Sequence, residues 1–588
     1  MIMTASLNIN FETLDEYMEE RCGGKEYFLG CWSAKNLNIN IDTHPENIHL
    51  AKGKNWFVLR NGADKIDGLI FPKNEPSDPE AVVFSGYLAD QGLHSYSPAD
   101  QVIEYWSKNL NQKHNGIFSA VTISNDGKEL NIVTDIFGIG PVCYREVDDM
   151  VLFASAPGLL SLEDDKPDLL SWLMRLIIGY VPGKETLSED VLLPVPASVT
   201  RFDGENKTFK KWYDHKALPK GEKVLDDEAL ELSEKALSKS IDRCEKIKFG
   251  TTILPFSSGH DSRRILAHLL DKKSTFEACT VQIPEPSGED VDLHYASLIA
   301  DEFNFNFTQL TIPDENEWHQ YEMRRIYSLD CQTSAHTWSV RLFNHYDKQH
   351  ACFYDGLGGD NFSLWPWDFD VGTIDLLPTA MPRCINTKNF PELKLLSWKL
   401  KDMYLPLTYG VNRSILTSIN WTTSKSTSLW AQQQVRPGQI VLCPYLDIDY
   451  VETMLNYVID EDQSTYPQAS ILKRFWPELA KYPCSRDFEE GTIKKATPQD
   501  PVDIGVARGK LQDVSQLKKL NLSFKLENSE FHFDSCLKPS SRFILFCSKY
   551  SAFLRNKIDW WLNPVVELML WWQSRPFIIK INKISSND

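Results

Sequence analysis

The amino-acid sequence predicts an α/β protein with a β-rich first third, followed by a parallel sheet with helices on both faces. The first observation is a series of short apolar runs between residues 80 and 160, separated by turns rich in Asn, Asp and Gly. The second is a repeated alternation of apolar strands and amphipathic helices beyond residue 250, which is typical of β-α-β units. The third is the length of 588 residues, which leaves room for more than one domain.

The β-rich region is expected to contain hairpins. Residues 124–127 read Ser-Asn-Asp-Gly, and these residue types tolerate the left-handed backbone that a tight turn requires. Residues 147–149, Val-Asp-Asp, are expected to form the turn of a second hairpin. The expected strands are 80–85, 116–123, 130–134, 142–145 and 151–154.

A second domain is expected after a polar linker. Residues 214–225 are rich in Lys, Pro, Gly and acidic residues, so we expect a first domain at 1–213 and a second at 226–588 with a helical C-terminal part. The expected elements of the second domain are helix 226–246, strand 251–256, helix 262–270, strand 276–283, helix 289–303, strand 307–312 and strand 351–354.

Composition and charge argue against several classes of function. The 62 Lys and Arg residues against 81 Asp and Glu give a charge of −19, which repels a phosphate backbone, so no nucleic-acid partner is expected. The acidic start lacks the regions of a signal peptide, and charges interrupt the apolar segment 542–577, so no membrane span is expected. The 12 cysteines include no CxxC pair, which favours reduced thiols and a cytoplasmic location.

A Ser-Ser-Gly-His-Asp-Ser segment between an apolar strand and an amphipathic helix is a candidate anion site. Such a loop presents unpaired N–H groups and the positive end of the helix dipole. Gly259 would let the backbone approach a pyrophosphate, and the hydroxyls of Ser257, Ser258 and Ser262 would donate to it. Asp261 would hold Mg²⁺, which bridges carboxylate and phosphate oxygens. Taken alone, the segment fits a capped helix after a tight turn equally well.

A second loop decides between these interpretations. Residues 355–360 read Asp-Gly-Leu-Gly-Gly-Asp and directly follow the expected strand 351–354. The carboxyl ends of parallel strands lie at one rim of the sheet, where ligands bind in open α/β folds. We therefore expect Gly358 and Gly359 beside a nucleotide and Asp360 as a second Mg²⁺ ligand.

Together the two loops resemble those of the asparagine synthetase superfamily, whose first loop reads SGGxDS and whose second reads SGEGxDE. Other segments agree in order between about residues 80 and 490. Residues 135–141 are similar to the family's RD-x-FG-x-x-PLYY, and residues 151–155 are similar to its L-x-FASE. Residues 180–187 are similar to GYVPG-x-xT, and residues 443–447 are similar to R-PFLD.

The resemblance implies an N-terminal Ntn-hydrolase-like αββα sandwich of the glutaminase type and a C-terminal domain like the adenine-nucleotide α-hydrolases. In that family ATP adenylates a carboxylate with release of pyrophosphate, and a nitrogen nucleophile then forms an amide. The implied ligands are ATP, Mg²⁺ and a small-molecule or peptide carboxylate and amine. The domain order is similar to that of β-lactam synthetases and lasso-peptide cyclases. A homodimer or a pathway partner is left open.

The first domain departs from the family pattern at its catalytic positions. Glutamine-dependent members carry a cysteine at position 2 whose free α-amine acts as its base, but this chain has Ile2. The family's oxyanion-hole Asn segment reads Ser85, Gly86 and Tyr87 here, and the Arg of its RD pair is Thr134. Glutamine hydrolysis is therefore expected to be absent.

The second domain departs as well. The two Glu residues of SGEGxDE fall on Leu357 and Asn361, which argues against aspartate as the substrate. The family's catalytic Lys has no clear counterpart; Lys481 and Arg486 are the nearest cations, and Arg486 is our candidate for stabilising the adenylating transition state. A plain surface cation would also explain either residue.

The sequence leaves three hypotheses open. The first is an ATP-dependent amide- or lactam-forming ligase that uses an amine other than glutamine-derived ammonia. The second is an asparagine synthetase that uses ammonia or glutamine, and the third is a non-catalytic ATP-binding relative. The intact acids and glycines of the two loops favour an enzyme. Between the loops, His336 and Trp338 fit either an acceptor pocket or core packing.

Overall fold

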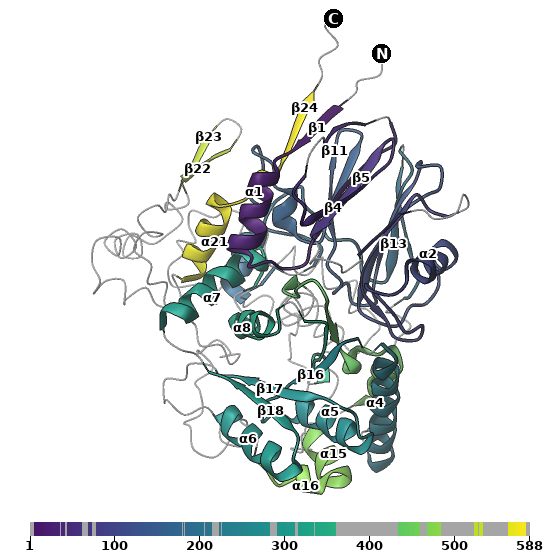
Figure 1. The fold of residues 1–588 in the computed structure, drawn as a ribbon, viewed down its shortest axis with the longest axis vertical. Helices are drawn as coiled ribbons and strands as arrows, with labels where there is room; N and C mark the ends of the chain where they lie inside the picture. The colour runs from purple at the N-terminus through teal and green to yellow at the C-terminus, as the bar shows by residue number, and fades with distance from the viewer. Residues whose placement is uncertain are drawn as a thin grey trace, which may run out of the picture.

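The computed structural model of the chain describes residues 5–35, 37–41, 44–61, 69–72, 78–178, 180–181, 183–204, 206–214, 223–224, 226–247, 249–282, 291–311, 315–333, 336–347, 349–359, 433–458, 467–483, 523–526, 529–532 and 563–583. Figure 1 shows a β-rich upper part and a lower part in which helices surround a parallel sheet. The predicted α/β fold class is confirmed.

The upper part is a sandwich of two antiparallel sheets. A five-stranded sheet has the order β11-β12-β2-β5-β4, and a seven-stranded sheet has the order β14-β13-β10-β9-β7-β6, with β8 beside β7. The strands of the first are β2 (Phe28–Ser33), β4 (Ile48–Lys52), β5 (Trp56–Asn61), β11 (Cys143–Val147) and β12 (Met150–Ala154). Those of the second are β6 (Leu69–Pro72), β7 (Ala81–Leu88), β8 (Leu93–His94), β9 (Phe118–Ile123), β10 (Leu130–Thr134), β13 (Ser198–Phe202) and β14 (Lys207–Lys211).

Apolar side chains from both sheets fill the space between them. Trp32 and Trp56 of the five-stranded sheet pack with Val121 and Ile132 of the seven-stranded sheet in one buried cluster. Alternate residues of each strand supply this layer, because successive side chains of a strand point to opposite faces. The two hairpins predicted from their turns are confirmed as β9–β10 and β11–β12.

Helices cover both outer faces of the sandwich. Helix α2 (Ala99–Lys108) buries Val102 and Trp106 against the outer face of the seven-stranded sheet. On the other side, α3 (Leu169–Ile178) packs Trp172 on the outer face of the five-stranded sheet, in the cluster that holds Leu29 and Leu152. The layering is therefore α, β, β, α, as expected.

Asp135, the first residue of the segment 135–141, organises a turn inside the sandwich. Its carboxylate accepts N–H groups of Phe137 at 2.8 Å, Gly140 at 2.6 Å and Phe118 at 3.2 Å. Burial raises the pKa of Asp135 to about 6, although these hydrogen bonds lower it. In this chain the segment around Asp135 builds the turn after β10.

The lower part is built on a five-stranded, wholly parallel sheet of order β18-β17-β16-β19-β20. Its strands are β16 (Thr251–Pro255), β17 (Glu277–Val281), β18 (Asn306–Leu310), β19 (Ala351–Tyr354) and β20 (Gln439–Leu442). Its helices are α4 (Asp227–Ile247), α5 (His260–Asp271), α6 (Val291–Phe303), α8 (Thr337–His345), α14 (Ile448–Leu455), α15 (Pro467–Phe475) and α16 (Pro477–Ala480).

Both faces of this sheet carry helices. Figure 1 shows α8 on one side of the sheet and α5 and α6 on the other. The expected elements from residue 226 to residue 354 are confirmed to within a few residues at their ends. Strands β16 and β19 are neighbours although the chain forms β17 and β18 between them, so the strand order reverses at this pair. Ligands of open α/β sheets bind at such a reversal.

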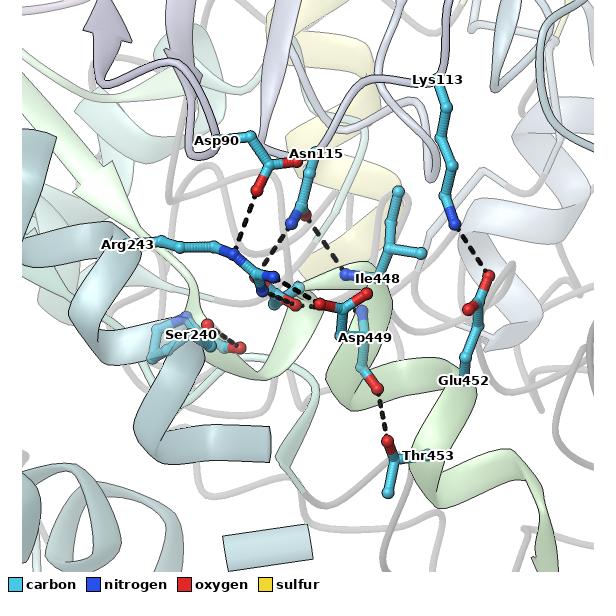
Figure 2. A network of polar contacts seen from close by, with 11 residues as sticks. Asp90, Lys113, Asn115, Ser240, Arg243, Ile448, Asp449, Glu452 and Thr453 are labelled. Carbon is cyan, nitrogen blue, oxygen red and sulfur yellow. Dashed lines mark hydrogen bonds and ion pairs between the residues drawn. The ribbon is translucent and has the colours of Figure 1, made fainter. Parts of the chain in front are cut away.

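The sandwich and the parallel-sheet part meet at the PFLD-like segment 443–447 and at Ile448, which follows it. Tyr87 of β7 accepts the N–H of Cys443 on its hydroxyl at 2.9 Å, and the Asn115 side chain bonds both Asp447 and Ile448. Figure 2 shows the contacts of Asn115 and, beside them, the guanidinium of Arg243.

Arg243 concentrates the charge of this interface. It reaches Asp90 of the sandwich at 3.0 Å and Asp447 at 2.7 Å, and it also pairs with Asp449 (Figure 2). A second ion pair, between Lys113 and Glu452 at 3.0 Å, lies beside it. Polar and charged contacts thus join the two parts of the molecule next to the first residues of α14.

The C-terminal segment returns to the sandwich side of the molecule. Strand β24 (Ile579–Lys583) pairs antiparallel with β1 (Ala5–Ile9), and β1 also pairs with β3 (Asn38–Asn40). Helix α21 (Asn563–Gln573) lies against α3, with the rings of Trp172 and Trp572 at 5.4 Å. Trp571 and Trp572 of this helix are buried in the same core cluster as Trp172.

The expected linker holds one regular element. Residues Lys223–Val224 form β15, which pairs in parallel with β21 (Tyr457–Val458). The boundaries at 213 and 226 themselves stay predictions. No helix in the described part of the chain is long and apolar enough to cross a membrane. The eight cysteines of the described ranges all carry free thiols and are buried.

Candidate functional site

The first loop motif, residues 257–262, spans the end of the β16–α5 connection and the first turn of α5, at the carboxyl edge of the parallel sheet. Strand β16 ends at Pro255, and helix α5 begins at His260 with Gly259 as its N-cap residue. The short strand and the capped helix leave only four residues between them, so the loop turns tightly at the end of the strand. This is the position that the sequence predicts for an anion site.

Hydroxyl groups stabilise the turn from within. Ser257 accepts the N–H of Gly259 on its Oγ at 3.1 Å. Ser262 accepts the N–H of Ser257 at 3.3 Å, and its Oγ lies 3.3 Å from the Oγ of Ser257. These serines shape the loop, and their donation to a phosphate stays a prediction.

A carboxylate binds the loop where an anion was expected. Asp292, in the first turn of α6, accepts the N–H of Ser258 at 3.0 Å and also its hydroxyl. The main chain and side chain of Ser258 therefore converge on one anionic oxygen. Asp292 lies 34 residues beyond Ser258, and no motif in the sequence indicates this contact.

The two predicted loops come together at Asp261. A Cβ added to Gly359 would lie 2.5 Å from both the Cγ and the Oδ1 of Asp261, and one added to Gly356 would lie 3.1 Å from the Asp261 Cβ. Only glycine leaves room for this approach. The second loop thus packs directly on the acidic side chain of the first, as expected for the ends of neighbouring parallel strands.

Two further residues hold Asp261, and neither was predicted. Gln468 of α15 donates from Nε2 to the Asp261 Oδ1 at 2.6 Å. Tyr445 donates its hydroxyl to the main-chain oxygen of Asp261 at 2.9 Å. Tyr445 lies in the PFLD-like segment, so the resemblance offered a hint of its location. No feature of the sequence around Gln468 indicates its role.

The start of the second loop carries a shielded acid. Asp355 accepts the N–H of Leu357 on Oδ1 at 3.2 Å, while its Oδ2 is buried and has no hydrogen-bond partner within the described structure. Burial raises the pKa of Asp355 to about 7. Leu357, where the family has Glu, is buried in the core of the parallel-sheet part.

Several candidate residues lie outside the described residues: Asp360, Asn361 and Arg486. Their predicted roles, including the paired Mg²⁺ ligands Asp261 and Asp360, stay predictions. Within the described ranges, no group of three or more His, Cys, Asp or Glu side chains could hold a metal ion. Lys481 is exposed and pairs with Glu302 of α6.

The two aromatic candidates lie at the start of α8. His336 caps this helix with a left-handed φ of 73° and is buried, and Trp338 is half-buried. Burial of His336 agrees with core packing, one of the two interpretations left open by the sequence.

Two of the positions at which the first domain departs from the glutaminase pattern, Gly86 and Thr134, make structural contacts in the described chain. Strand β1 lies in a three-stranded sheet with β24 and β3, outside both sheets of the sandwich, and Ile2 precedes the described residues. Gly86 has a φ of +94°, and a Cβ there would lie 2.1 Å from the Ile117 oxygen. Thr134 donates its hydroxyl to the main-chain oxygen of Val195 at 2.7 Å.

Comparison with known proteins does not assign a family. No family model matches the chain, and no curated protein matches it. One similar solved structure is an allosteric regulatory enzyme of purine biosynthesis, with 8% identity over 52% of this chain and 79% of that chain and a TM-score of 0.21. Another is the glutamine phosphoribosylpyrophosphate amidotransferase of B. subtilis complexed with ADP and GMP, with 10% identity over 78% of this chain and 90% of that chain and a TM-score of 0.22. Similarity at these TM-scores does not establish a shared fold or a shared function.

Proposed function

We propose that the chain is an ATP-dependent carbon–nitrogen ligase of the asparagine synthetase type, without a glutaminase activity of its own. The observation that carries the proposal is the contact between the two loops, in which Gly356 and Gly359 lie against Asp261 at the ends of β16 and β19. This pair of loops, a Ser/Gly turn before a helix and a Gly-rich turn after a strand, is the feature that resembles the family.

The first loop suits a pyrophosphate. Its Ser258 N–H and hydroxyl already bind a carboxylate oxygen of Asp292, so the loop has donors arranged for an anion. The N-terminus of α5 adds the positive end of a helix dipole at the same place. A phosphate oxygen that replaced the Asp292 carboxylate would meet the same two donors.

The proposed reaction has two steps, adenylation of the carboxylate and transfer of the acyl group to the amine. A carboxylate oxygen of the substrate attacks the α-phosphorus of ATP, and the bond to the β-phosphate oxygen breaks to release pyrophosphate. An amine nitrogen then attacks the acyl carbon, AMP leaves with the bonding electron pair, and the amine loses a proton. Asp261 and Asp360 would hold Mg²⁺, which when bound neutralises charge on the phosphate oxygens. Arg486 is the proposed cation for the adenylating step.

The absence of a glutaminase rests on Ile2, because a side chain without a nucleophilic atom cannot form the thioester that hydrolysis of glutamine needs. Incubation with glutamine should therefore give no glutamate above the buffer rate. Enzyme-dependent glutamate release would overturn this part of the proposal.

A second candidate is a non-catalytic ATP-binding protein. The observation that favours it is the burial of Leu357, which leaves an apolar side chain where the family has an acid. The two candidates differ in a measurable way. A ligase exchanges labelled pyrophosphate into ATP in the presence of its acid substrate, whereas a binding protein shows ATP affinity without exchange. An ammonia-dependent asparagine synthetase would show the exchange with aspartate.

A further inference from the structure

We propose that Gln468 is a positioning residue for Asp261: its side-chain amide, fixed by Arg264, holds the Asp261 carboxylate against the second loop while that carboxylate keeps its charge. The inference rests on the proposed function, in which Asp261 is a cation ligand. Nothing in the sequence motifs points to Gln468, since it lies 207 residues beyond Asp261.

The contact is direct and enclosed. Gln468, near the start of α15, is fully buried, and its Nε2 lies 2.6 Å from the Asp261 Oδ1. Gly359 approaches the same carboxylate, because a Cβ at this position would lie 2.5 Å from the Asp261 Oδ1. The carboxylate of Asp261 therefore contacts both an amide donor and the second loop.

Arg264, the other neighbour of the Gln468 amide, determines which way its oxygen and its NH₂ group point. The Arg264 Nη1 donates to the Oε1 of Gln468. A guanidinium group has only donors, so the oxygen of the amide must face Arg264 and the NH₂ must face Asp261. The reverse orientation would place two donors together on one side and two acceptors together on the other.

Arg264 is itself held rigidly. Its Nη2 donates to the Glu234 Oε2 at 2.8 Å, and its guanidinium lies 5.5 Å from the ring of Tyr445 and 5.9 Å from that of Tyr450. Burial alone would raise the pKa of Glu234, but the ion pair with Arg264 contributes to lowering it to about 2. The positive charge of Arg264 is thus balanced by Glu234, not by Asp261.

This arrangement suits a carboxylate that must bind a cation. A Lys or Arg at position 468 would form an ion pair with Asp261 and compete with a metal ion for it. A neutral amide orients the carboxylate without cancelling its charge. Groups that orient a metal ligand in this way typically raise metal affinity by about ten- to a hundredfold.

The test combines two measurements on the full chain. The first compares the melting temperatures of Gln468→Met, Asp261→Asn and the double variant. If the two side chains form one unit, the double variant should lose less than the sum of the single losses. Strictly additive losses would overturn the inference, whether or not the protein binds ATP.

The second measurement is the change in ATP affinity on adding Mg²⁺, followed by calorimetry. Gln468→Met should weaken the Mg²⁺-dependent part by about tenfold or more, and Gln468→Asn, whose amide is one methylene short, should lose less. The matched control is Gln434→Met, which removes another buried amide, one bonded to Ser328 and Ser339. The control should leave the Mg²⁺ dependence unchanged.

The outcomes separate the two proposals. If Asp261→Asn abolishes the Mg²⁺ dependence and Gln468→Met leaves it intact, the positioning role is wrong and the proposed function stands. If the wild-type protein shows no Mg²⁺-dependent ATP binding, the proposed function fails, and the role of Gln468 toward a cation fails with it. In that case non-additive melting temperatures would still establish that Gln468 holds Asp261.

Discussion

The side-chain amide of Asn115 in the sandwich lies 2.9 Å from the carboxylate of Asp447, the residue that caps helix α14 of the parallel-sheet part. The same side chain accepts the N–H of Ile448 at 3.2 Å. Two residues before Asp447, Tyr445 bonds the main chain of Asp261. A single short segment therefore contacts the sandwich on one side and the candidate site on the other.

Substitution of Asn115 should destabilise the molecule measurably. Asn115→Leu would leave the enclosed Asp447 carboxylate and the Ile448 N–H each short of one partner, at a cost of about 1–3 kcal/mol. Urea unfolding measures the difference. Asn456→Leu, at the exposed end of the same helix, is the control and should cost about 0.5 kcal/mol or less. Equal losses in the two variants would contradict the role given to Asn115.

Glu567 should be a second sensitive position. It pairs with Arg175 at 2.7 Å and with Arg325 at 2.6 Å, and both arginines are buried. Glu567→Ala leaves two buried charges without this partner, so we expect a loss of about 3–5 kcal/mol in unfolding free energy.

The exposed pair of Glu16 and Arg21 provides the comparison for Glu567. Because water screens this pair, Glu16→Ala should cost less than about 1 kcal/mol. If Glu567→Ala also cost less than about 1 kcal/mol, the Glu567 carboxylate would not be what anchors α21.

Asp292 should compete with anions for the first loop. Because its carboxylate binds the N–H and hydroxyl of Ser258, Asp292→Asn removes a negative charge from the loop and should strengthen pyrophosphate binding several-fold. Calorimetry with inorganic pyrophosphate measures the change. Asp301→Asn, on an exposed turn of the same helix, removes the same charge and should have little effect. Unchanged or weaker binding by Asp292→Asn would argue against an anion site at Ser258.

Asp355 should give the stability of the protein a defined pH dependence. Its pKa is about 7 in the folded chain and about 3.9 when unfolded, so the folded state binds more protons between these values. The stabilisation is complete below about pH 4 and is lost as the pH rises toward 7, with a slope of up to about 1.4 kcal/mol per pH unit.

The variant Asp355→Asn isolates this contribution, because an amide does not titrate in that range. Relative to the wild type, its unfolding free energy should rise between about pH 5 and about pH 8. Urea unfolding at both pH values is the measurement. Parallel pH profiles for the two proteins would show that Asp355 is not buried as an acid.

The sequence predicted those features that depend on local pattern. The β-α-β alternation gave the strands β16 and β19, and the geometry of parallel sheets then required their two loops to meet at Asp261. The hairpins followed from turn residues for the same reason. These are cases in which neighbouring residues determine the backbone.

The contacts that hold the site could not be predicted in this way. Gln468 and Asp292 reach the loop from helices that follow it in the chain, and nothing in their neighbouring residues specifies which side chain they meet. Strand β24 pairs with β1 across almost the whole length of the chain. Tertiary packing determines such contacts, and the local pattern of a single sequence does not specify that packing.

The most direct test of the proposed function is the release of pyrophosphate and AMP from ATP and Mg²⁺, measured for the wild type and for Asp261→Ala. The assay uses a panel of carboxylates and amines that includes aspartate with ammonia. We predict acid-dependent release of pyrophosphate and AMP in equal amounts by the wild type, and none by Asp261→Ala. Release of ADP and phosphate instead, or full activity of Asp261→Ala, would contradict the proposal.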